Sequence, residues 1–178
     1  MIFDEYMLKS KVKTHSNCPY NTGKRHFDLQ LLYASPVTLH MVADALVQKY
    51  LESNITHIAV VAPYGLTLGS IMAYSLARPM VILHASGELP GDWYTQDIYN
   101  SKRTISLGKH IDLTGTNVLL FDDVIRTGET LVAASTLIKK AGGEVTDACC
   151  IAIASEFGGA STAQELGINL TNLLAFQA

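Results

Sequence analysis

Short apolar runs alternate with segments of helical periodicity along most of the chain. The runs predict strands at residues 57–62, 80–83, 117–121, 145–154 and 170–176. Apolar positions spaced three or four residues apart predict helices at residues 36–52, 66–77, 130–141 and 160–167. Because the predicted strands are apolar throughout, both faces of their sheet must be covered. The pattern therefore predicts a single Rossmann-like α/β domain, with a central parallel sheet flanked by helices.

Two stretches depart from this pattern. Residues 1–34 are polar and rich in turn-forming residues, so we expect an irregular N-terminal hood segment ahead of an α/β core at residues 35–178. Residues 85–116 form a long polar excursion that holds two weak strands at most. Loops of this length inside a compact domain usually have a functional role. We therefore expect a flexible loop or arm at about residues 85–106.

Composition and charge narrow the class of protein. Of 178 residues, 48% are hydrophobic and 16% are charged, which is typical of a well-packed globular domain. The net charge of −3 provides no general attraction for nucleic acid. No apolar run is long enough to span a membrane, and the N-terminus lacks the features of a signal peptide. Three cysteines without disulfide or zinc-site spacing complete the expectation of a reduced, cytoplasmic location.

The most informative segment is VLLFDDVIRTGET, residues 118–130. A buried strand is predicted to end at two acidic residues, and a Thr-Gly-x-Thr turn then opens a helix. Such a turn suits a phosphate, because backbone amides, hydroxyl groups and the positive end of the helix dipole converge there. The residues predicted to bind phosphate are Arg126, Thr127, Gly128, Glu129 and Thr130.

Asp122 and Asp123 precede this turn, and their carboxylates carry the same negative charge as a phosphate. They would repel a phosphate, and they suit sugar hydroxyl groups or a bridging divalent cation. Side chains of neighbouring strand residues point to opposite faces, but the following bend can direct both acids to one ligand. A phosphate site beside a site for a diol indicates a ribose 5-phosphate. A solvated turn with a helix N-cap is the alternative for the acids alone.

This segment resembles the phosphoribosyl pyrophosphate (PRPP) signature of type I phosphoribosyltransferases. It lacks the Gly-Lys-Ser/Thr of a nucleotide-binding P-loop. Residues 26–50 and 57–91 are similar in order and spacing to adenine phosphoribosyltransferases. The stretch DWYTQDIYNSKRTISL, residues 92–107, resembles the flexible loop of the xanthine enzymes.

The resemblance implies a purine phosphoribosyltransferase of purine salvage. Such an enzyme transfers the 5-phosphoribosyl group from PRPP to a nucleobase of the adenine or xanthine type and releases pyrophosphate. It implies Mg²⁺ as cofactor, held largely through PRPP with Asp122 and Asp123 as candidate ligands, and a homodimer as the default assembly. Two alternatives stay open: an orotate phosphoribosyltransferase, and a non-catalytic regulatory relative that binds PRPP.

The same resemblance implies roles for individual residues. Asp122 and Asp123 would be the catalytic pair, holding the ribose hydroxyls and accommodating positive charge in the transition state. Pyrophosphate would be bound by Pro63, Tyr64, Gly65 and His84. The flexible loop would contribute Tyr99, Lys102 and Arg103. The nucleobase would contact Phe27, which could stack on it, together with Val124, Glu156 and Phe157.

The chain departs from the adenine enzymes where pyrophosphate should bind. Tyr64 stands where those enzymes usually carry an arginine, and His84 stands where an arginine or lysine usually ends the next strand. The residues that follow Tyr99 also lack the usual glutamate. The first two departures remove positive charge from the leaving-group side, and they favour the regulatory alternative. The intact acids and the long loop favour an enzyme.

Overall fold

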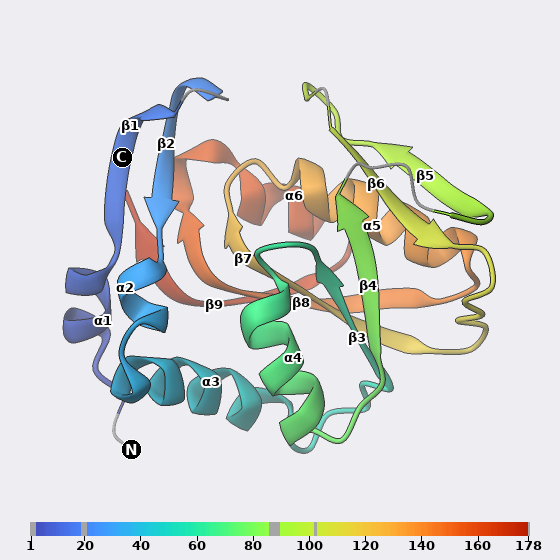
Figure 1. Ribbon diagram of the computed structural model, residues 1–178, viewed down its shortest axis with the longest axis horizontal. Helices are drawn as coiled ribbons and strands as arrows, with labels where there is room; N and C mark the ends of the chain where they lie inside the picture. Colours follow the sequence, from blue (N-terminus) through green and yellow to red (C-terminus); the bar gives the residue numbers. More distant parts are fainter. Residues whose placement is uncertain (1–2, 19–20, 86–89, 102, 178) are drawn as a thin grey trace.

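The structure of the protein is a computed structural model that describes residues 3–18, 21–85, 90–101 and 103–177, with backbone alone at 16–18 and 21–25. In this part of the chain, seven strands form one sheet in the order β5-β6-β4-β3-β7-β8-β9 (Figure 1). Their bounds are β3 His57–Val61, β4 Met80–Ala85, β5 Trp93–Asp97, β6 Thr104–Gly108, β7 Asn117–Ile125, β8 Glu144–Ala154 and β9 Asn169–Phe176.

The sheet is parallel from β4 to β9 and antiparallel at one edge. Strands β4, β3, β7, β8 and β9 run in the same direction. Strand β6 pairs antiparallel with β4, and β5 pairs antiparallel with β6. The expected central parallel sheet is confirmed. The two weak strands of the polar excursion form an arm that extends the sheet beyond β4.

Helices cover both faces of the sheet. On one face lie α3 (Pro36–Tyr50) and α4 (Leu66–Ser75), whose apolar side chains pack with Ile58, Leu119 and Phe121. On the other face lie α5 (Glu129–Lys140) and α6 (Gly159–Glu165), which pack with Val118 and Leu120. Residues 118–121 thus alternate between the two layers, as expected of a strand that is buried on both sides.

The expectation that residues 1–34 are irregular is wrong. They form α1 (Glu5–Lys11), β1 (Lys13–Cys18), β2 (Asn21–Asp28) and α2 (Gln30–Tyr33). Strands β1 and β2 pair only with each other in the described chain, as an antiparallel hairpin. Their polar sequences lack the apolar run that marks a buried strand, which explains the error. The boundary between a hood at 1–34 and a core at 35–178 stays a prediction.

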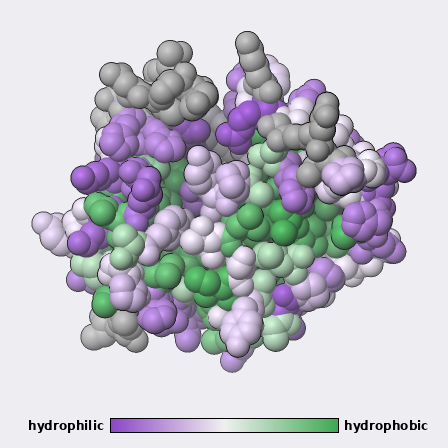
Figure 2. Space-filling view, viewed as in Figure 1, coloured by the Kyte–Doolittle hydropathy of each residue, from purple (hydrophilic) through white to green (hydrophobic). Residues whose placement is uncertain are grey.

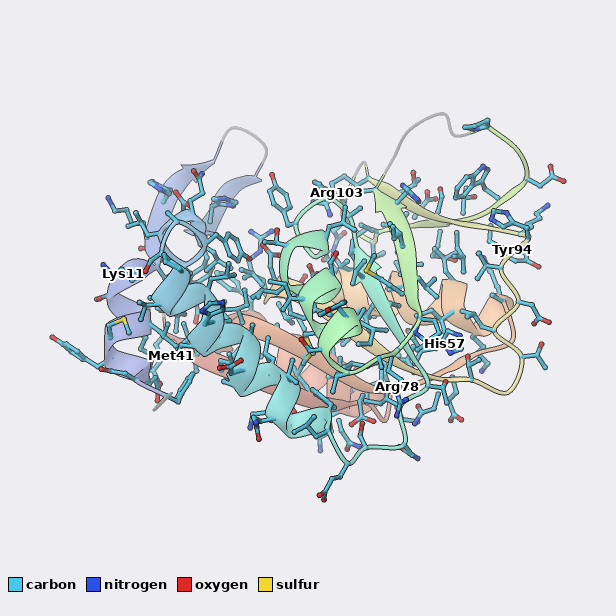
Figure 3. All side chains as sticks on the ribbon, turned by 60° about the horizontal axis from the view of Figure 1, so that its bottom comes forward. Lys11, Met41, His57, Arg78, Tyr94 and Arg103 are labelled. Carbon is cyan, nitrogen blue, oxygen red and sulfur yellow. The ribbon has the colours of Figure 1, made fainter. Side chains whose placement is uncertain are left out.

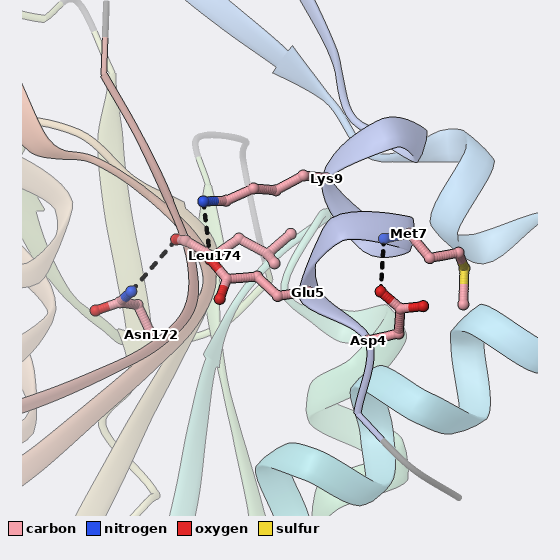
Figure 4. A network of polar contacts seen from close by, with 6 residues as sticks. All are labelled: Asp4, Glu5, Met7, Lys9, Asn172 and Leu174. Atoms are coloured by element: carbon pink, nitrogen blue, oxygen red, sulfur yellow. Dashed lines mark hydrogen bonds and ion pairs between the residues drawn. The ribbon is translucent and has the colours of Figure 1, made fainter.

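Helix α1 joins this N-terminal part to the far edge of the sheet. The Met7 amide donates to Asp4 Oδ1 at 2.9 Å, which caps the helix, and Glu5 and Lys9 form an ion pair at 2.8 Å (Figure 4). Lys9 Nζ also lies 6.0 Å from the ring centroid of Phe176, on β9. The β1–β2 hairpin lies beside the end of the sheet at which the parallel strands finish (Figure 1).

An apolar surface lies over α4 and the neighbouring β4 on the face seen in Figure 2. Helix α4, with the sequence LTLGSIMAYS, has partly exposed apolar side chains at Leu66 and Ile71 beside its exposed residues. Tyr74 is 89% exposed and Met80 is 37% exposed there. Within the described chain, none of the helices is both long and apolar enough to cross a membrane.

Candidate active site

Strand β7 continues through the two acidic residues to Ile125, which corrects the expectation that the strand ends at Phe121. Pairing with β8 extends past the apolar run, with Asp122 opposite Cys150 and Val124 opposite Ala152. Each carboxylate accepts a hydrogen bond from the next backbone amide: Asp123 N to Asp122 Oδ1 at 3.0 Å, and Val124 N to Asp123 Oδ1 at 2.8 Å. The two acids are therefore part of strand β7 and do not lie in the turn that follows it.

The two carboxylates have different surroundings. Asp122 lines a small pocket with Val61, Leu120 and Leu131, on the face covered by α5. Asp123 has His26 and Tyr33 of the N-terminal segment as its electrostatic neighbours. Alternation along β7 accounts for this division. One acid therefore belongs to the α5 side of the site, and the other belongs to the side of the hairpin.

Burial makes the ionised pair costly. Loss of solvent raises the pKa of Asp122 well above its ordinary value, the charge of Asp123 raises it further, and Arg103 opposes both effects. Burial also raises the pKa of Asp123, while the Val124 amide and the His26 ring lower it. Two neighbouring carboxylates of this kind gain from contact with hydroxyl donors or a cation. The electrostatics therefore suit a polyol, a divalent cation, or both.

The turn after β7 has a backbone shape that depends on glycine. Gly128 has a φ of +79°, and a Cβ atom there would lie 2.7 Å from Thr162 Cβ. Thr162 Oγ1 donates to the Thr127 carbonyl at 2.9 Å, which ties α6 to the turn. Helix α5 then begins at Glu129. The turn thus places backbone amides at a helix N-terminus, the arrangement that binds anions, while the phosphate role of Arg126–Thr130 stays a prediction.

The turn between β3 and α4 lies against β7. A Cβ atom at Gly65 would lie 2.7 Å from the Val61 carbonyl oxygen and 3.3 Å from that of Phe121. This close approach requires glycine and places the segment Pro63–Gly65 beside the strand that carries the acids. The peptide bond before Pro63 is cis, and Tyr64 is 66% exposed. The predicted pyrophosphate turn therefore adjoins the carboxylates, and the Tyr64 side chain is open to a ligand.

His84 lies near the end of β4 and is held by the arm. Its ring centroid is 5.6 Å from that of Trp93 on β5, in an edge-to-face arrangement. Trp93 Nε1 in turn donates to the Pro90 carbonyl at 2.9 Å. The position of His84 on the strand next to β3 agrees with a place near the pyrophosphate turn, although its binding role stays a prediction.

The arm brings a cation to the acids. Arg103 is exposed, follows the tip between β5 and β6, and lowers the pKa of Asp122. Figure 3 shows Arg103 and Arg78 at opposite ends of the sheet. Tyr99, at the same tip, is 75% exposed. Lys102 was also assigned to this loop and lies outside the described residues. Of the assigned loop residues, Arg103 is therefore close enough to Asp122 for its charge to lower the pKa of that carboxyl.

The residues assigned to the nucleobase are spread over three segments. Val124 is partly buried and packs against the core on the α3 and α4 side. Glu156 is exposed and Phe157 is partly buried, in the short helix η1 (Ser155–Phe157) after β8. Phe27 is 6% exposed, and its ring packs 5.2 Å from that of Phe176. Protein therefore covers the Phe27 ring, and a stacking role would require that ring to be uncovered.

The sequence analysis gave no role in the site to three residues near the acids or the glycine turn. His26 and Tyr33 face Asp123 because the N-terminal segment folds over the strand ends. Thr162 supports the glycine turn from a helix more than thirty residues further along the chain. Lys24, Arg25 and His26 form a small basic cluster in the sequence, which is more typical of a solvated turn, and the pattern contained no signal for Tyr33 or Thr162.

The donor set fits a magnesium ion that a substrate brings with it. In the described chain, no group of three or more His, Cys, Asp or Glu side chains could hold a metal ion. The site offers the two carboxylates instead. Mg²⁺ is commonly held by one or two carboxylates, with substrate phosphates and water completing its coordination.

The acids, the glycine turn and the adjoining loops lie together at the carboxyl edge of the parallel sheet. Open α/β domains generally bind their ligands at that edge. Residues 30–167 match the family model for the phosphoribosyl transferase domain. The chain therefore belongs to the phosphoribosyl transferase family, which confirms the resemblance found in the sequence.

Relatives of known name cover nearly the whole chain. An adenine phosphoribosyltransferase of Stutzerimonas stutzeri is 38% identical, over 99% of this chain and 97% of its own length. The adenine phosphoribosyltransferase of Pseudomonas aeruginosa strain LESB58 is 36% identical over the same shares. The enzyme of that name from Giardia lamblia, in complex with 9-deazaadenine, superposes with a TM-score of 0.86 at 26% identity, covering 96% of this chain and 97% of its own. These relatives confirm the expected fold.

Proposed function

We propose that the protein is a purine phosphoribosyltransferase of purine salvage. It transfers the 5-phosphoribosyl group from PRPP to a base of the adenine type and releases pyrophosphate. The observation that carries this proposal is the family match, which spans the acid pair of β7 and the glycine turn at the start of α5. The full-length similarity to adenine phosphoribosyltransferases supports adenine as the base.

In this mechanism the protein positions its substrates and supplies no nucleophile. Asp122 and Asp123 hold the ribose hydroxyls, and their charge stabilises the positive charge that grows on the sugar as pyrophosphate departs. The amides and hydroxyls of Arg126–Thr130 hold the 5-phosphate at the N-terminus of α5. The segment Pro63–Gly65 and His84 receive pyrophosphate. The arm, with Tyr99 and Arg103, covers the reacting atoms and excludes water.

The proposal includes Mg²⁺ and a cytoplasmic location. The metal would be held by PRPP oxygens together with Asp122 and Asp123, and it supplies positive charge that neutralises the diphosphate. This matters here because Tyr64 and His84 occupy positions that usually carry a fixed cation. Removal of Mg²⁺ by a chelator is therefore expected to abolish turnover, and readdition should restore it.

The proposal also includes a homodimer. The apolar surface over α4 and β4, with Tyr74 and Met80 exposed, is suited to burial against a second copy (Figure 2). Light scattering with size-exclusion chromatography should give twice the mass of the chain. A Tyr74→Glu variant should shift that mass toward the monomer. A monomeric wild-type protein would contradict the assembly without affecting the proposed chemistry.

A non-catalytic PRPP-binding role is the second candidate, because Tyr64 and His84 reduce the charge offered to pyrophosphate. One experiment separates the two. Purified protein is mixed with PRPP, Mg²⁺ and adenine, xanthine, guanine, hypoxanthine or orotate in turn, and nucleotide and pyrophosphate are measured. AMP from adenine supports the enzyme. PRPP binding without product from any base supports the regulator, and absence of PRPP binding overturns both.

A further inference from the structure

Three aromatic rings lie together at the base of the arm, where β5 and β6 join β4. The ring centroid of Trp93 lies 5.6 Å from that of His84 and 6.5 Å from that of His110, and both contacts are edge-to-face. Aromatic pairs favour this geometry at these separations. A Cβ atom at Gly108 would overlap the His110 ring, so glycine is required there for the ring to take this place. His84, Trp93 and His110 therefore form a packed aromatic cluster.

Strand pairing places His84 and Trp93 on the same face of the sheet. His84 is paired with Ser106 on β6, and Trp93 is paired with Gly108, two residues further along the same strand. Residues two apart on a strand point to the same face, so the two side chains are diagonal neighbours on it. The contact between their rings therefore follows from the register of β4, β6 and β5 and does not depend on the tip of the arm.

The opposite face of β5 packs against α5. Tyr94 lies with the core cluster on that side, and Lys140 Nζ at the end of α5 donates to Gln96 Oε1 at 3.1 Å. The base of the arm is thus fixed to a helix of the α/β core. A side chain on a fixed support can hold a neighbouring ring in one orientation. Trp93 has such a support.

His84 lies beside the turn that is proposed to receive pyrophosphate. The Ala62 amide donates to the Leu83 carbonyl at 2.9 Å, which joins the residue before Pro63 to the residue before His84. Within the described chain, no hydrogen bond or ion pair reaches the His84 ring, whose ring contact is with Trp93. The ring nitrogens can therefore bind a ligand, while Trp93 sets the orientation of the ring.

We propose that Trp93 is a positioning residue that fixes the His84 imidazole for binding of pyrophosphate. The inference rests on the proposed function, because that function supplies pyrophosphate as the ligand of His84. An imidazole donates hydrogen bonds in fixed directions from its ring, so a ring that is already oriented binds an anion more tightly than a mobile one. The base of the arm thereby contributes to affinity for the leaving group, separately from the tip that carries Tyr99 and Arg103.

The first test is a double-mutant cycle on pyrophosphate binding, measured by calorimetry with Mg²⁺ present. Trp93→Leu should weaken pyrophosphate binding by about three- to tenfold and leave ribose 5-phosphate binding unchanged. Trp93→Phe keeps an aromatic ring and should retain most of the affinity. In a protein that already carries His84→Ala, Trp93→Leu should have no further effect, because the ring that Trp93 positions is gone.

The next residue on β5 provides a matched control. Tyr94 is also a partly buried aromatic residue, but it lies on the α5 side of the strand. Tyr94→Leu removes an aromatic ring from the same strand and should leave pyrophosphate binding unchanged. An effect that is confined to Trp93→Leu cannot then result from loosening of β5 as such.

A second measurement needs no substitution of Trp93. It is the only tryptophan of the chain, so intrinsic tryptophan fluorescence reports on this cluster alone. Saturating pyrophosphate should change the emission, because a ligand on the imidazole alters the charge beside the indole. The change should be absent in His84→Ala. This measurement decides the matter even where Trp93→Leu does not fold.

Four outcomes would overturn the inference: unchanged pyrophosphate binding in Trp93→Leu, equal losses with and without His84→Ala, an equal loss in Tyr94→Leu, or unchanged emission at saturating pyrophosphate. Failure of the proposed function gives a different result. A protein that forms no nucleotide from any base, but shows the expected pattern with pyrophosphate, would refute turnover and retain the positioning role. A folded wild-type protein that binds neither PRPP nor pyrophosphate would refute both.

Discussion

The two ends of the active site differ in how the chain builds them. The proposed sugar-phosphate end consists of contiguous residues, from the acids of β7 to the first turn of α5, and it presents backbone amides at a glycine turn. The proposed leaving-group end combines the turn after β3, the end of β4 and the arm, and it presents Tyr64 and His84. We therefore expect substitutions at the end that uses backbone amides to cost more binding and stability than substitutions at the end that is assembled from separate side chains.

The strongest way to break this comparison is to remove the charge of one acid. Asp123→Asn should lower kcat by about 10²- to 10³-fold, because the carboxylate faces positive charge that grows in the transition state. Glu156→Gln, on an exposed loop residue, should lower kcat by less than about threefold. Steady-state kinetics with PRPP and adenine measure both. Equal, small losses from the two variants would contradict the role of the acids.

A second variant tests the glycine turn. Gly128→Ala should destabilise the fold by about 1–3 kcal/mol and weaken ribose 5-phosphate binding, because of the positive φ and the contact with Thr162. Gly158 is the control: its φ is +82°, and a Cβ there would meet nothing within 4 Å. Urea unfolding should show the smaller loss for Gly158→Ala. Equal losses would mean that the contact with Thr162 contributes nothing.

A third variant concerns the stability cost of the acid pair. Burial and the charge of Asp123 raise the folded pKa of Asp122 above its unfolded value. A carboxyl group whose pKa is raised in the folded state destabilises the folded protein as the pH rises from the unfolded pKa toward the folded pKa. Asp122→Asn should therefore raise Tm at pH 8, by about 2–4 °C for each kcal/mol recovered, and have little effect near pH 4. Thermal unfolding at both pH values checks this, and a pH-independent gain would indicate another cause.

The smallest expected effect concerns the leaving-group end. Tyr64→Arg places a cation on the exposed side of the pyrophosphate turn and should tighten pyrophosphate binding by about two- to fivefold. Tyr6→Arg adds the same charge at an exposed position on α1 and serves as the control. Inhibition by pyrophosphate measures the effect. A gain from Tyr6→Arg as large as that from Tyr64→Arg would attribute it to overall charge.

Patterns confined to one segment were predicted well from the sequence. The apolar runs identified the five parallel strands, and helical spacing identified α3, α4, α5 and α6. The hairpin at residues 13–28 was missed because its polar strands pair with each other outside the core sheet. The extension of β7 to Ile125 was missed because a partner strand, β8, continues the pairing beyond the apolar residues.

Contacts between distant segments were the hardest part of the site to predict. The acids and the glycine turn are contiguous, so their motif was readable. The charges of the acids raise the pKa of Tyr33 because the N-terminal segment folds near the strand ends, and Thr162 contacts Gly128 because α6 packs beside the turn. Neither of these long-range proximities produces a pattern in a single sequence from which it could be predicted. Phe27 shows the opposite problem, since an aromatic residue suited to stacking is covered by Phe176.

Helix α5 links the two ends through its length. Its first residue, Glu129, follows the glycine turn, and Lys140 in its last turn donates to Gln96 Oε1 on β5 at 3.1 Å. Twelve residues correspond to an axial separation of about 18 Å. One residue inserted into the helix would rotate Lys140 by about 100° and move it away from β5. The helix thus sets the spacing between the glycine turn and the arm. Insertions here should be tolerated less well than insertions at Gly115, in the turn between β6 and β7, where a Cβ atom would meet nothing within 4 Å.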